Sequence, residues 1–261
     1  MSLQRCAGAA ALALAVAACA GDAAPEEQSR DGLPARAAGQ LLISAAASLA
    51  DVFAEMEQAF ENRHPEVDVL LNLGSSSSLR SQILDGAPAD VFASANAANM
   101  DRIVEAGAVS GLPRVFARNT LQIAVPAGNP AGVAGLEDFA DEGLRLGLCA
   151  REVPCGELAW QALDGAGITP SLDTGEPNVR ALLTKVALGE LDAGITYATD
   201  VAAAAGAVDG IEIPRALNRS SDYSAAVLAG APNPDAARAF IEFILSPAGR
   251  ATLANHGFIL P

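Results

Sequence analysis

From Gln40 to the C-terminus, short apolar runs alternate with stretches whose large apolar side chains recur at helical spacing. Residues 41–45 and 67–73 are the first two runs, and a helical pattern follows each of them. Strand and helix patterns that alternate in this way predict an α/β fold with a mostly parallel sheet. About 220 residues of such sequence are enough to bury a core in one or two domains.

The pattern predicts the position of most elements. Strands are expected at residues 41–45, 67–73, 89–93, 120–125, 144–148, 193–197 and 223–228, and helices at 48–60, 79–84, 100–105, 156–163, 178–188, 236–245 and 248–255. Ser48 precedes Asp51 by three positions, which is close to a capping box, so the first helix is expected to begin at Ser48. The run that ends at Pro126 could carry the chain into a second domain. We expect residues 124–221 to form a lobe inserted into a first lobe of residues 40–123 and 222–261.

The N-terminal residues indicate export. Arg5 precedes an apolar segment at residues 9–18, which is shorter than the roughly 20 residues that span a membrane. Residues 1–18 are therefore expected to be a cleaved signal peptide. Val16, Ala17, Ala18 and Cys19 resemble a lipobox, so we expect a lipid on Cys19 and a flexible tether at residues 19–39. The alternative is an ordinary signal peptide with an incidental cysteine.

Export also bears on the remaining cysteines and on charge. Cys6 leaves with the signal and Cys19 would be lipidated, so Cys149 and Cys155 remain and are expected to form a disulfide. A pair of free thiols is the alternative.

Loss of residues 1–18 removes one base, which leaves 15 basic against 31 acidic residues and a formal charge of −16. This charge excludes a nucleic-acid binder, and it means that any anion site must act through local dipoles.

Hydrogen-bond donors gather at the expected turns from strand to helix. Ser48 and the serine run 75–78 open two helices, residues 153–156 and 177–180 open two more, and Tyr197 ends a strand. Helix N-termini present unpaired amides and favour negative charge. A site of donors alone suits an oxyanion without a proton, because an unpaired buried O–H costs about 1–3 kcal/mol. The alternatives are that Ser48 is only a cap, the serine run only a polar loop and Tyr197 only a packing residue.

Two charged residues near these turns are interpreted as structural. Asp90 is the one carboxylate close enough to the donor segments to disturb an oxyanion. Arg180 is expected to pair with an acid across the cleft rather than to bind the ligand directly. Neither residue is therefore included in the predicted binding site.

Other function classes lack their chemistry here. A serine hydrolase is the first alternative, but there is no Gly-x-Ser-x-Gly elbow, and His64 and His256 lie outside the donor-bearing turns. A receptor for a metal cation is also disfavoured, because two isolated histidines and an expected disulfide do not provide the ligands of a transition-metal site. We expect neither an enzyme nor a cofactor, and an adhesive or structural lipoprotein remains as an alternative.

Several segments resemble, in the same order, the family of periplasmic molybdate-binding proteins. They are residues 44–49, 74–79, 86–92, 153–156, 178–180 and 189–197, and the resemblance spans about residues 40–261. It implies a bilobal periplasmic-binding-protein fold of type II, in which a hinge joins two α/β domains and the ligand lies in the cleft between them. It also implies the ligand contacts, namely the hydroxyls of Ser48, Ser76 and Tyr197 and the backbone amides of Cys155 and Val179. The assignment of Ser76 depends on an alignment choice of one position.

The resemblance further implies a function. The chain would be an extracytoplasmic monomer that captures molybdate, and tungstate through its equal charge and shape, and delivers it to the permease of an ABC importer. Its place would be periplasmic or at the cell surface, with Cys19 as the membrane anchor. Cys155 stands where many relatives have alanine, and a backbone contact tolerates that change. A receptor for sulfate or another tetrahedral oxyanion on the same fold is the alternative.

Overall fold

The computed structural model describes residues 38–261. The predictions of a signal peptide, of a lipid on Cys19 and of most of the tether therefore lie outside the described residues. No helix in the described part of the chain has the length and apolar character that a membrane span requires.

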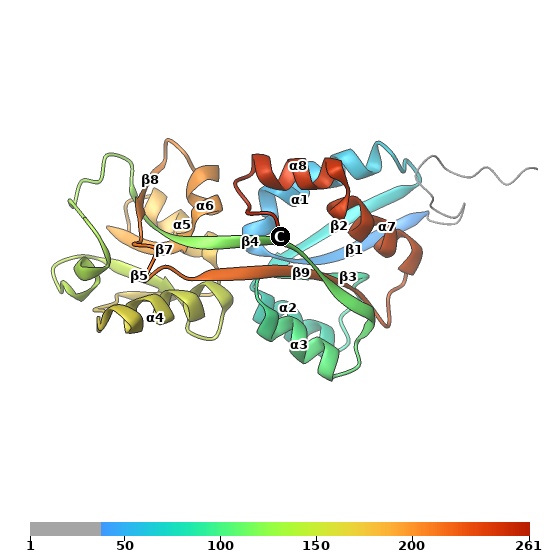
Figure 1. Ribbon diagram of the computed structural model, residues 1–261, viewed down its shortest axis with the longest axis horizontal. Helices are drawn as coiled ribbons and strands as arrows, with labels where there is room; N and C mark the ends of the chain where they lie inside the picture. Colours follow the sequence, from blue (N-terminus) through green and yellow to red (C-terminus); the bar gives the residue numbers. More distant parts are fainter. Residues whose placement is uncertain (1–37) are drawn as a thin grey trace, which may run out of the picture.

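The chain forms two lobes that lie side by side (Figure 1). The first lobe contains β1 (Gly39–Ala46), η1 (Ala47–Leu49), α1 (Ala50–Glu61), β2 (Val67–Gly74), α2 (Ser76–Leu84), β3 (Val91–Ser94), α3 (Ala97–Glu105), α7 (Pro234–Leu245) and α8 (Pro247–Asn255). The second contains η2 (Leu136–Ala140), β5 (Leu146–Cys149), α4 (Pro154–Ala166), β6 (Thr174–Glu176), α5 (Val179–Ala187), β7 (Ala193–Tyr197), α6 (Ala198–Ala203) and β8 (Val208–Glu212). Two long strands, β4 (Val109–Pro126) and β9 (Ser220–Leu228), join the lobes.

The strands follow the order β2-β1-β3-β9-β4-β7-β5-β6, and β8 pairs with β4. Strand β4 is antiparallel to β9 up to Thr120 and to β7 from Leu121 onward, so a single strand belongs to both lobes. Strand β1 is parallel to β2 and β3, and β5 is parallel to β6 and β7. The prediction of a mostly parallel sheet is wrong in this respect, because β9 pairs antiparallel with β3 and β4, and β4 pairs antiparallel with β7 and β8 as well.

Each lobe has its own hydrophobic core. In the first lobe, Phe53, Phe60 and Phe240 meet edge to face between the sheet and the helices α1 and α7, with ring centroids 5.2–5.7 Å apart. A smaller cluster around Phe92 packs α2 and α3 against the opposite face of the sheet. The core of the second lobe draws its residues from 121–213, with Ala47 added from the first lobe. The lobe boundaries predicted at residues 123 and 221 stay predictions.

The turns at the ends of β1 and β2 differ from expectation. The first helix does not begin at Ser48: this residue lies inside the 3-10 turn η1, and α1 begins at Ala50 without a side-chain cap. The Ser48 hydroxyl bonds instead to the hydroxyl of Tyr223, at 2.8 Å. Helix α2 begins earlier than expected, at Ser76, because the Ser75 hydroxyl accepts a hydrogen bond from the Ser78 amide at 3.2 Å.

Four short elements have no counterpart in the sequence-based prediction: η2, β6, β8 and α6. Strand β6 has only three residues, and β8 has five, of which only Val208 and Ile211 are apolar. Such segments carry too few apolar side chains to show a periodicity, and their backbone pairing with β5 and β4 determines their conformation.

Candidate functional site

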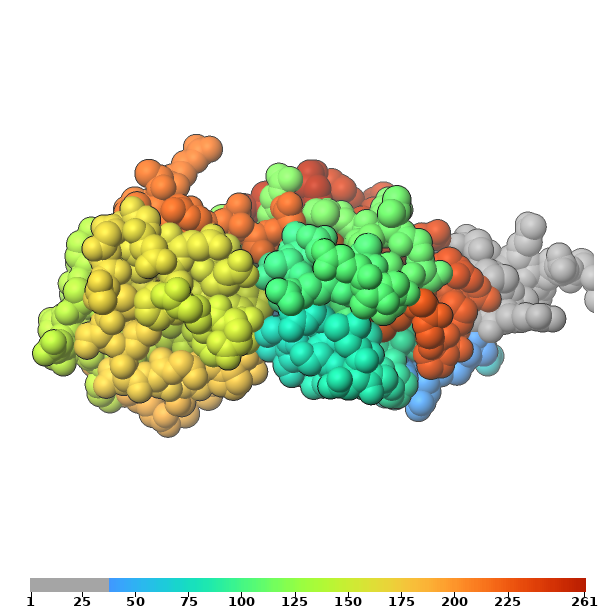
Figure 2. Space-filling model, turned by 90° about the horizontal axis from the view of Figure 1, so that it is seen from below, coloured from blue at the N-terminus to red at the C-terminus, as the bar shows by residue number. Residues whose placement is uncertain are grey.

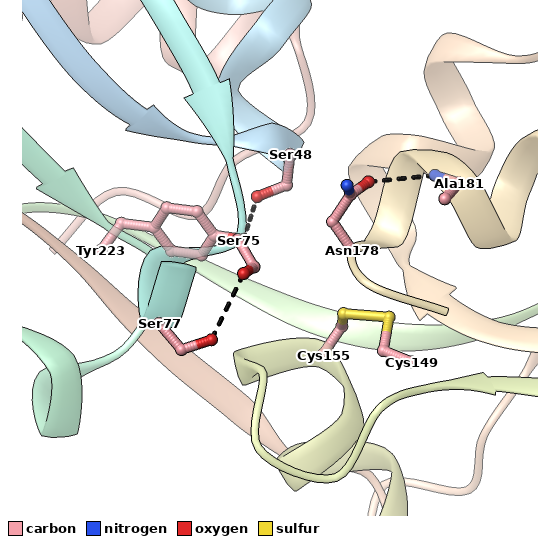
Figure 3. Close-up of a disulfide and its surroundings, with 8 residues drawn as sticks. All are labelled: Ser48, Ser75, Ser77, Cys149, Cys155, Asn178, Ala181 and Tyr223. Carbon is pink, nitrogen blue, oxygen red and sulfur yellow. Dashed lines mark hydrogen bonds between the residues drawn. A yellow bond between two sulfur atoms is a disulfide. The ribbon is translucent and has the colours of Figure 1, made fainter. Parts of the chain in front are cut away.

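A small cavity of about 20 Å³ lies where the two lobes meet. Both lobes supply its walls: Ala46, Ala47, Ser48, Gly74, Ser75, Ser76 and Ala95 come from the first, and Pro154, Cys155, Asn178 and Val179 from the second. In Figure 3, Ser48 and Ser75 stand on one side and Asn178 and the disulfide stand on the other. No charged side chain is among these lining residues.

Four of the five predicted ligand contacts come together at this cavity. Ser48, Ser76, Cys155 and Val179 all line it, although they lie on four different elements. Tyr197 is not a lining residue; it is 1% exposed at the end of β7, and its hydroxyl has no hydrogen-bond partner within residues 38–261. The ligand roles of all five residues stay predictions.

The Ser76 hydroxyl is oriented as a donor. The backbone amide of Ala95 donates to Ser76 Oγ at 2.9 Å, and this bond is buried. A backbone N–H can only donate, so the Ser76 oxygen is already an acceptor and its own hydrogen remains free for another partner. Ser76 therefore presents a hydrogen to the cavity that it lines.

Two helix N-termini from the second lobe point at the same cavity. Val179 is the first residue of α5 and Cys155 the second residue of α4, where backbone amides have no partner within the helix. No side chain caps α4, and Pro154 before Cys155 brings no N–H. The partial positive charge of both helix ends favours an anion in this place.

The loop that carries the Cys155 amide is held tightly. Cys149 at the end of β5 forms the predicted disulfide with Cys155, and the two Cα atoms are 5.8 Å apart. Gly156 is required beside it, because a Cβ there would lie 2.0 Å from the carbonyl oxygen of Ala150. The start of α4 is thus pressed against the end of β5, which fixes the direction of the Cys155 amide.

Charged residues surround the cavity without lining it. Arg180, next to Val179, hydrogen-bonds Asp51 of the first lobe, and its Nε lies 3.1 Å from Asp200 Oδ1. This agrees with the prediction that Arg180 pairs with an acid across the cleft. Asp90 is fully buried and accepts bonds from the amides of Leu42, at 2.8 Å, and Asn233, so the structural interpretation of Asp90 is confirmed.

Burial controls the ionisation of the groups behind the cavity. It raises the pKa of Asp200 to about 7, although the positive charge of Arg180 opposes the shift. It also holds the pKa of the Tyr197 and Tyr223 hydroxyls above the ordinary value of a tyrosine. Both phenols therefore keep their protons at neutral pH and stay hydrogen-bond donors.

A larger groove of about 650 Å³ adjoins the cavity at Ser75. It runs between α2 and α3 of the first lobe and the loop that precedes α4, where yellow atoms meet cyan and green ones in Figure 2. Asn96 Nδ2 donates to Glu157 Oε2 at 3.0 Å across it, which is a second contact between the lobes. The groove opens to solvent and leads toward the serine run.

The residues that hydrolysis or metal binding would need are not at the cavity. His256 Nε2 lies 2.8 Å from Glu55 Oε2, and the His64 ring packs on Phe60 with centroids 4.5 Å apart. Neither histidine lines the cavity. Within residues 38–261 no group of three or more His, Cys, Asp or Glu side chains is placed to hold a metal ion.

Sequence reasoning missed Tyr223 and Asn178. The Asn178 side chain caps α5 by accepting from the Ala181 amide at 3.0 Å, and it lines the cavity. Tyr223 lay in a predicted strand and was treated as an apolar position. The chain has two tyrosines, and they pack together here with ring centroids 6.0 Å apart, a proximity that no local pattern reveals.

Comparisons with known proteins agree with this architecture. Residues 41–259 match the family model described as bacterial extracellular solute-binding protein. The molybdate-binding protein ModA of Mycobacterium tuberculosis H37Rv is 36% identical over 228 residues, which cover 87% of each chain.

Two solved structures share the fold. The periplasmic molybdate-binding protein of Azotobacter vinelandii has a TM-score of 0.74 at 21% identity and covers 85% of this chain and 99% of its own. The sulfate-binding protein SubI of Mycobacterium tuberculosis has the same TM-score at 19% identity, with 84% and 86% covered. These likenesses confirm the predicted class, an α/β periplasmic-binding-protein fold.

Proposed function

Because the chain belongs to the bacterial extracellular solute-binding proteins and is a homologue of their molybdate-binding members, we propose that it captures molybdate for an ABC importer. It is a binding protein and not an enzyme, as its homologues are. Tungstate has the same charge and shape and is expected to bind equally. The ligand leaves unchanged, and no cofactor takes part.

One observation carries the proposal: the cavity between the lobes is small, uncharged and supplied with donors. At about 20 Å³ it is far below the roughly 300–1,000 Å³ of sites for organic solutes. Ser76 offers a hydroxyl hydrogen, and the first amides of α4 and α5 offer N–H groups. Donors without a carboxylate suit an oxyanion that carries no proton. The proposed contacts are Ser48, Ser76, Cys155, Val179 and Tyr197.

We further propose how binding proceeds. The two lobes are joined by β4 and β9, which provide the hinge for opening and closing. The dianion first meets the serines of the first lobe, and closure then brings the two helix N-termini of the second lobe to it. The closed monomer would dock on a permease in the membrane. Residues 1–18 would direct export, and a lipid on Cys19 with a tether at 19–39 would keep the protein at the membrane.

Titration calorimetry with molybdate, tungstate, sulfate and hydrogen phosphate tests the function. We expect saturable one-to-one binding of molybdate and tungstate by the chain produced without residues 1–18, and at least tenfold weaker binding of the other two. A chain that binds none of the four is not an oxyanion receptor. The anchor is tested separately by mass spectrometry of the exported full chain, which would detect the added mass of a lipid on Cys19.

Sulfate is the second candidate, and the structural likeness to SubI favours it. Sulfate is also a tetrahedral dianion without a proton, so the donor set alone does not distinguish it. The size of the ion distinguishes sulfate from molybdate, because the Mo–O bond is longer than the S–O bond. Equal affinity for sulfate and molybdate would support the sulfate receptor.

A further inference from the structure

The Ser48 hydroxyl is hydrogen-bonded to the hydroxyl of Tyr223, with the two oxygens 2.8 Å apart. Both side chains are buried, Ser48 with 5% and Tyr223 with none of its surface exposed. They come from η1 and β9, which are 175 residues apart in sequence. Only Ser48 lines the cavity, so Tyr223 lies one step behind the site (Figure 3).

The Tyr223 ring has little freedom to move. Edge-to-face contacts surround it, with centroids 5.4 Å from Phe258, 6.0 Å from Tyr197 and 6.4 Å from Phe116. Such contacts fix the ring plane and hence the position of the hydroxyl. The Tyr223 oxygen therefore has a fixed position, and the Ser48 hydroxyl orients relative to it.

When an oxyanion is bound, only one of the two hydroxyls, that of Tyr223, can be the donor in the hydrogen bond between Ser48 and Tyr223. A dianion without a proton only accepts hydrogen bonds, so Ser48 must donate its single hydrogen to the ligand. The Ser48 oxygen then accepts from Tyr223, which stays protonated because burial raises its pKa. Ser76 has the same arrangement, with the Ala95 amide in the place of the phenol. Each serine thus has a donor behind it that leaves its own hydrogen for the ligand.

We propose that Tyr223 is a positioning residue that orients Ser48 as a donor and thereby sets the preference of the site for unprotonated over protonated oxyanions. The inference rests on the proposed function. A hydrogen phosphate ion carries a proton and needs an acceptor for it. While Tyr223 occupies the Ser48 oxygen, that serine is a poor acceptor, and the other donors leave the ligand's proton without a partner.

The conservative change Tyr223→Phe keeps the ring and removes only the hydroxyl. Ser48 then turns freely, so it still donates to molybdate but also accepts from a protonated oxyanion. Molybdate affinity is expected to fall about threefold to tenfold, since the Ser48 hydroxyl is no longer held in the orientation in which it donates to the ligand. The affinity for hydrogen phosphate is expected to stay or rise, so the ratio of the molybdate affinity to the phosphate affinity falls by at least about threefold.

The test uses the chain without residues 1–18 and measures both affinities at pH 7.5. Molybdate binding is to be followed by the fluorescence of Trp160, the single tryptophan, which lies on α4, and hydrogen phosphate by its competition with molybdate. Ser48→Ala and the double variant with Tyr223→Phe complete a cycle. Once Ser48 is alanine, removal of the Tyr223 hydroxyl should no longer change the ratio of affinities.

Ser246→Ala is the matched control, because it removes a partly buried hydroxyl that caps α8 and does not line the cavity. Its affinity ratio should equal that of the unchanged chain. A Tyr223→Phe variant that folds but keeps the original ratio would overturn the inference, as would an equal loss for both ions. If the unchanged chain binds no molybdate, the proposed function fails instead, and the two failures are thus distinguishable.

Discussion

The Arg180 guanidinium on α5 hydrogen-bonds the Asp51 carboxylate on α1 and so joins the two lobes beside the cavity. Both residues follow proposed ligand contacts closely, since Arg180 comes directly after Val179 and Asp51 three residues after Ser48. Arg180 is held from behind by the buried Asp200, whose Oδ1 lies 3.1 Å from its Nε. If the lobes open as proposed, this contact between α5 and α1 must break, so we expect the pair to stabilise the closed form.

Asp51→Asn should shorten the time for which the ligand is held. Both side chains are partly exposed, so the pair contributes about 0.2–1 kcal/mol, and the dissociation rate of molybdate should rise by up to about fivefold. Stopped-flow fluorescence of Trp160 measures this rate. Asp235→Asn removes a similar pair, that of Asp235 and Arg238 on α7, far from the cleft, and should leave the rate unchanged. Equal rates in all three proteins would show that the pair does not stabilise closure.

Asp200 should make stability depend on pH. Its pKa is raised from 3.8 to about 7 in the folded protein, so between these values the folded form holds a proton that the unfolded chain has lost. The contribution of Asp200 is therefore complete below about pH 4 and is lost as the pH rises through 7. At 1.36 kcal/mol per pH unit this amounts to at most about 4 kcal/mol.

Asp200→Asn tests this because an amide does not titrate. We compare the free energy of unfolding by urea at pH 4.5, 6 and 8 for the two proteins. The unchanged chain should lose stability relative to the variant from the first pH to the last. Parallel profiles would mean that Asp200 stays ionised throughout and that Arg180 outweighs its burial.

The elements that place the site could be read from the sequence wherever their apolar pattern was strong. Strand β7 was predicted at its observed limits, Ala193–Tyr197, and α7 within two residues, because buried positions determine both. The cap at Ser48 was predicted wrongly. A local rule assigned its hydroxyl to the helix, whereas Tyr223, distant in the sequence, takes it in the folded protein.

The limits of local patterns also apply to the candidate site. Local patterns indicated only the turns into helices that contain Ser76, Cys155 and Val179, and the resemblance to molybdate-binding proteins implied these particular residues within them. The partners that give these residues a direction were not found: the Ala95 amide behind Ser76, for example, depends on how α2 meets the end of β3. Tertiary contacts of this kind leave no periodic trace in the chain.

Ser76→Ala should weaken molybdate binding more than Ser77→Ala. Ser76 lines the cavity and its hydrogen is free, whereas Ser77 lines the outer groove and its hydroxyl bonds to that of Ser75 at 3.3 Å. A hydrogen bond to a charged partner contributes about 1.5–3 kcal/mol, which is roughly tenfold or more in affinity. Calorimetry on the two variants measures the difference. A larger loss at Ser77 would move the contact by one position and contradict the assignment of Ser76.

Removal of the disulfide should affect stability more than affinity. Cys149 and Cys155 close a ring with a sequence separation of 6, and such a small ring lowers the entropy of the unfolded chain by an amount equivalent to about 2–3 kcal/mol. The double change of both residues to alanine should lower the free energy of unfolding by that amount. The contact proposed for Cys155 is made by its backbone amide, which the change preserves.

Affinity in this double variant is therefore expected to fall by less than about threefold, a loss below 1 kcal/mol. The loss is small because the backbone contacts at the start of α4 are independent of the sulfur atoms: the Val153 amide donates to the Ala150 carbonyl at 3.1 Å, and Gly156 lets α4 approach that carbonyl closely. Urea unfolding and molybdate titration on the same preparation separate the two effects. A tenfold or greater loss of affinity with unchanged stability would show that the bridge acts on the ligand-bound loop itself rather than on the unfolded chain.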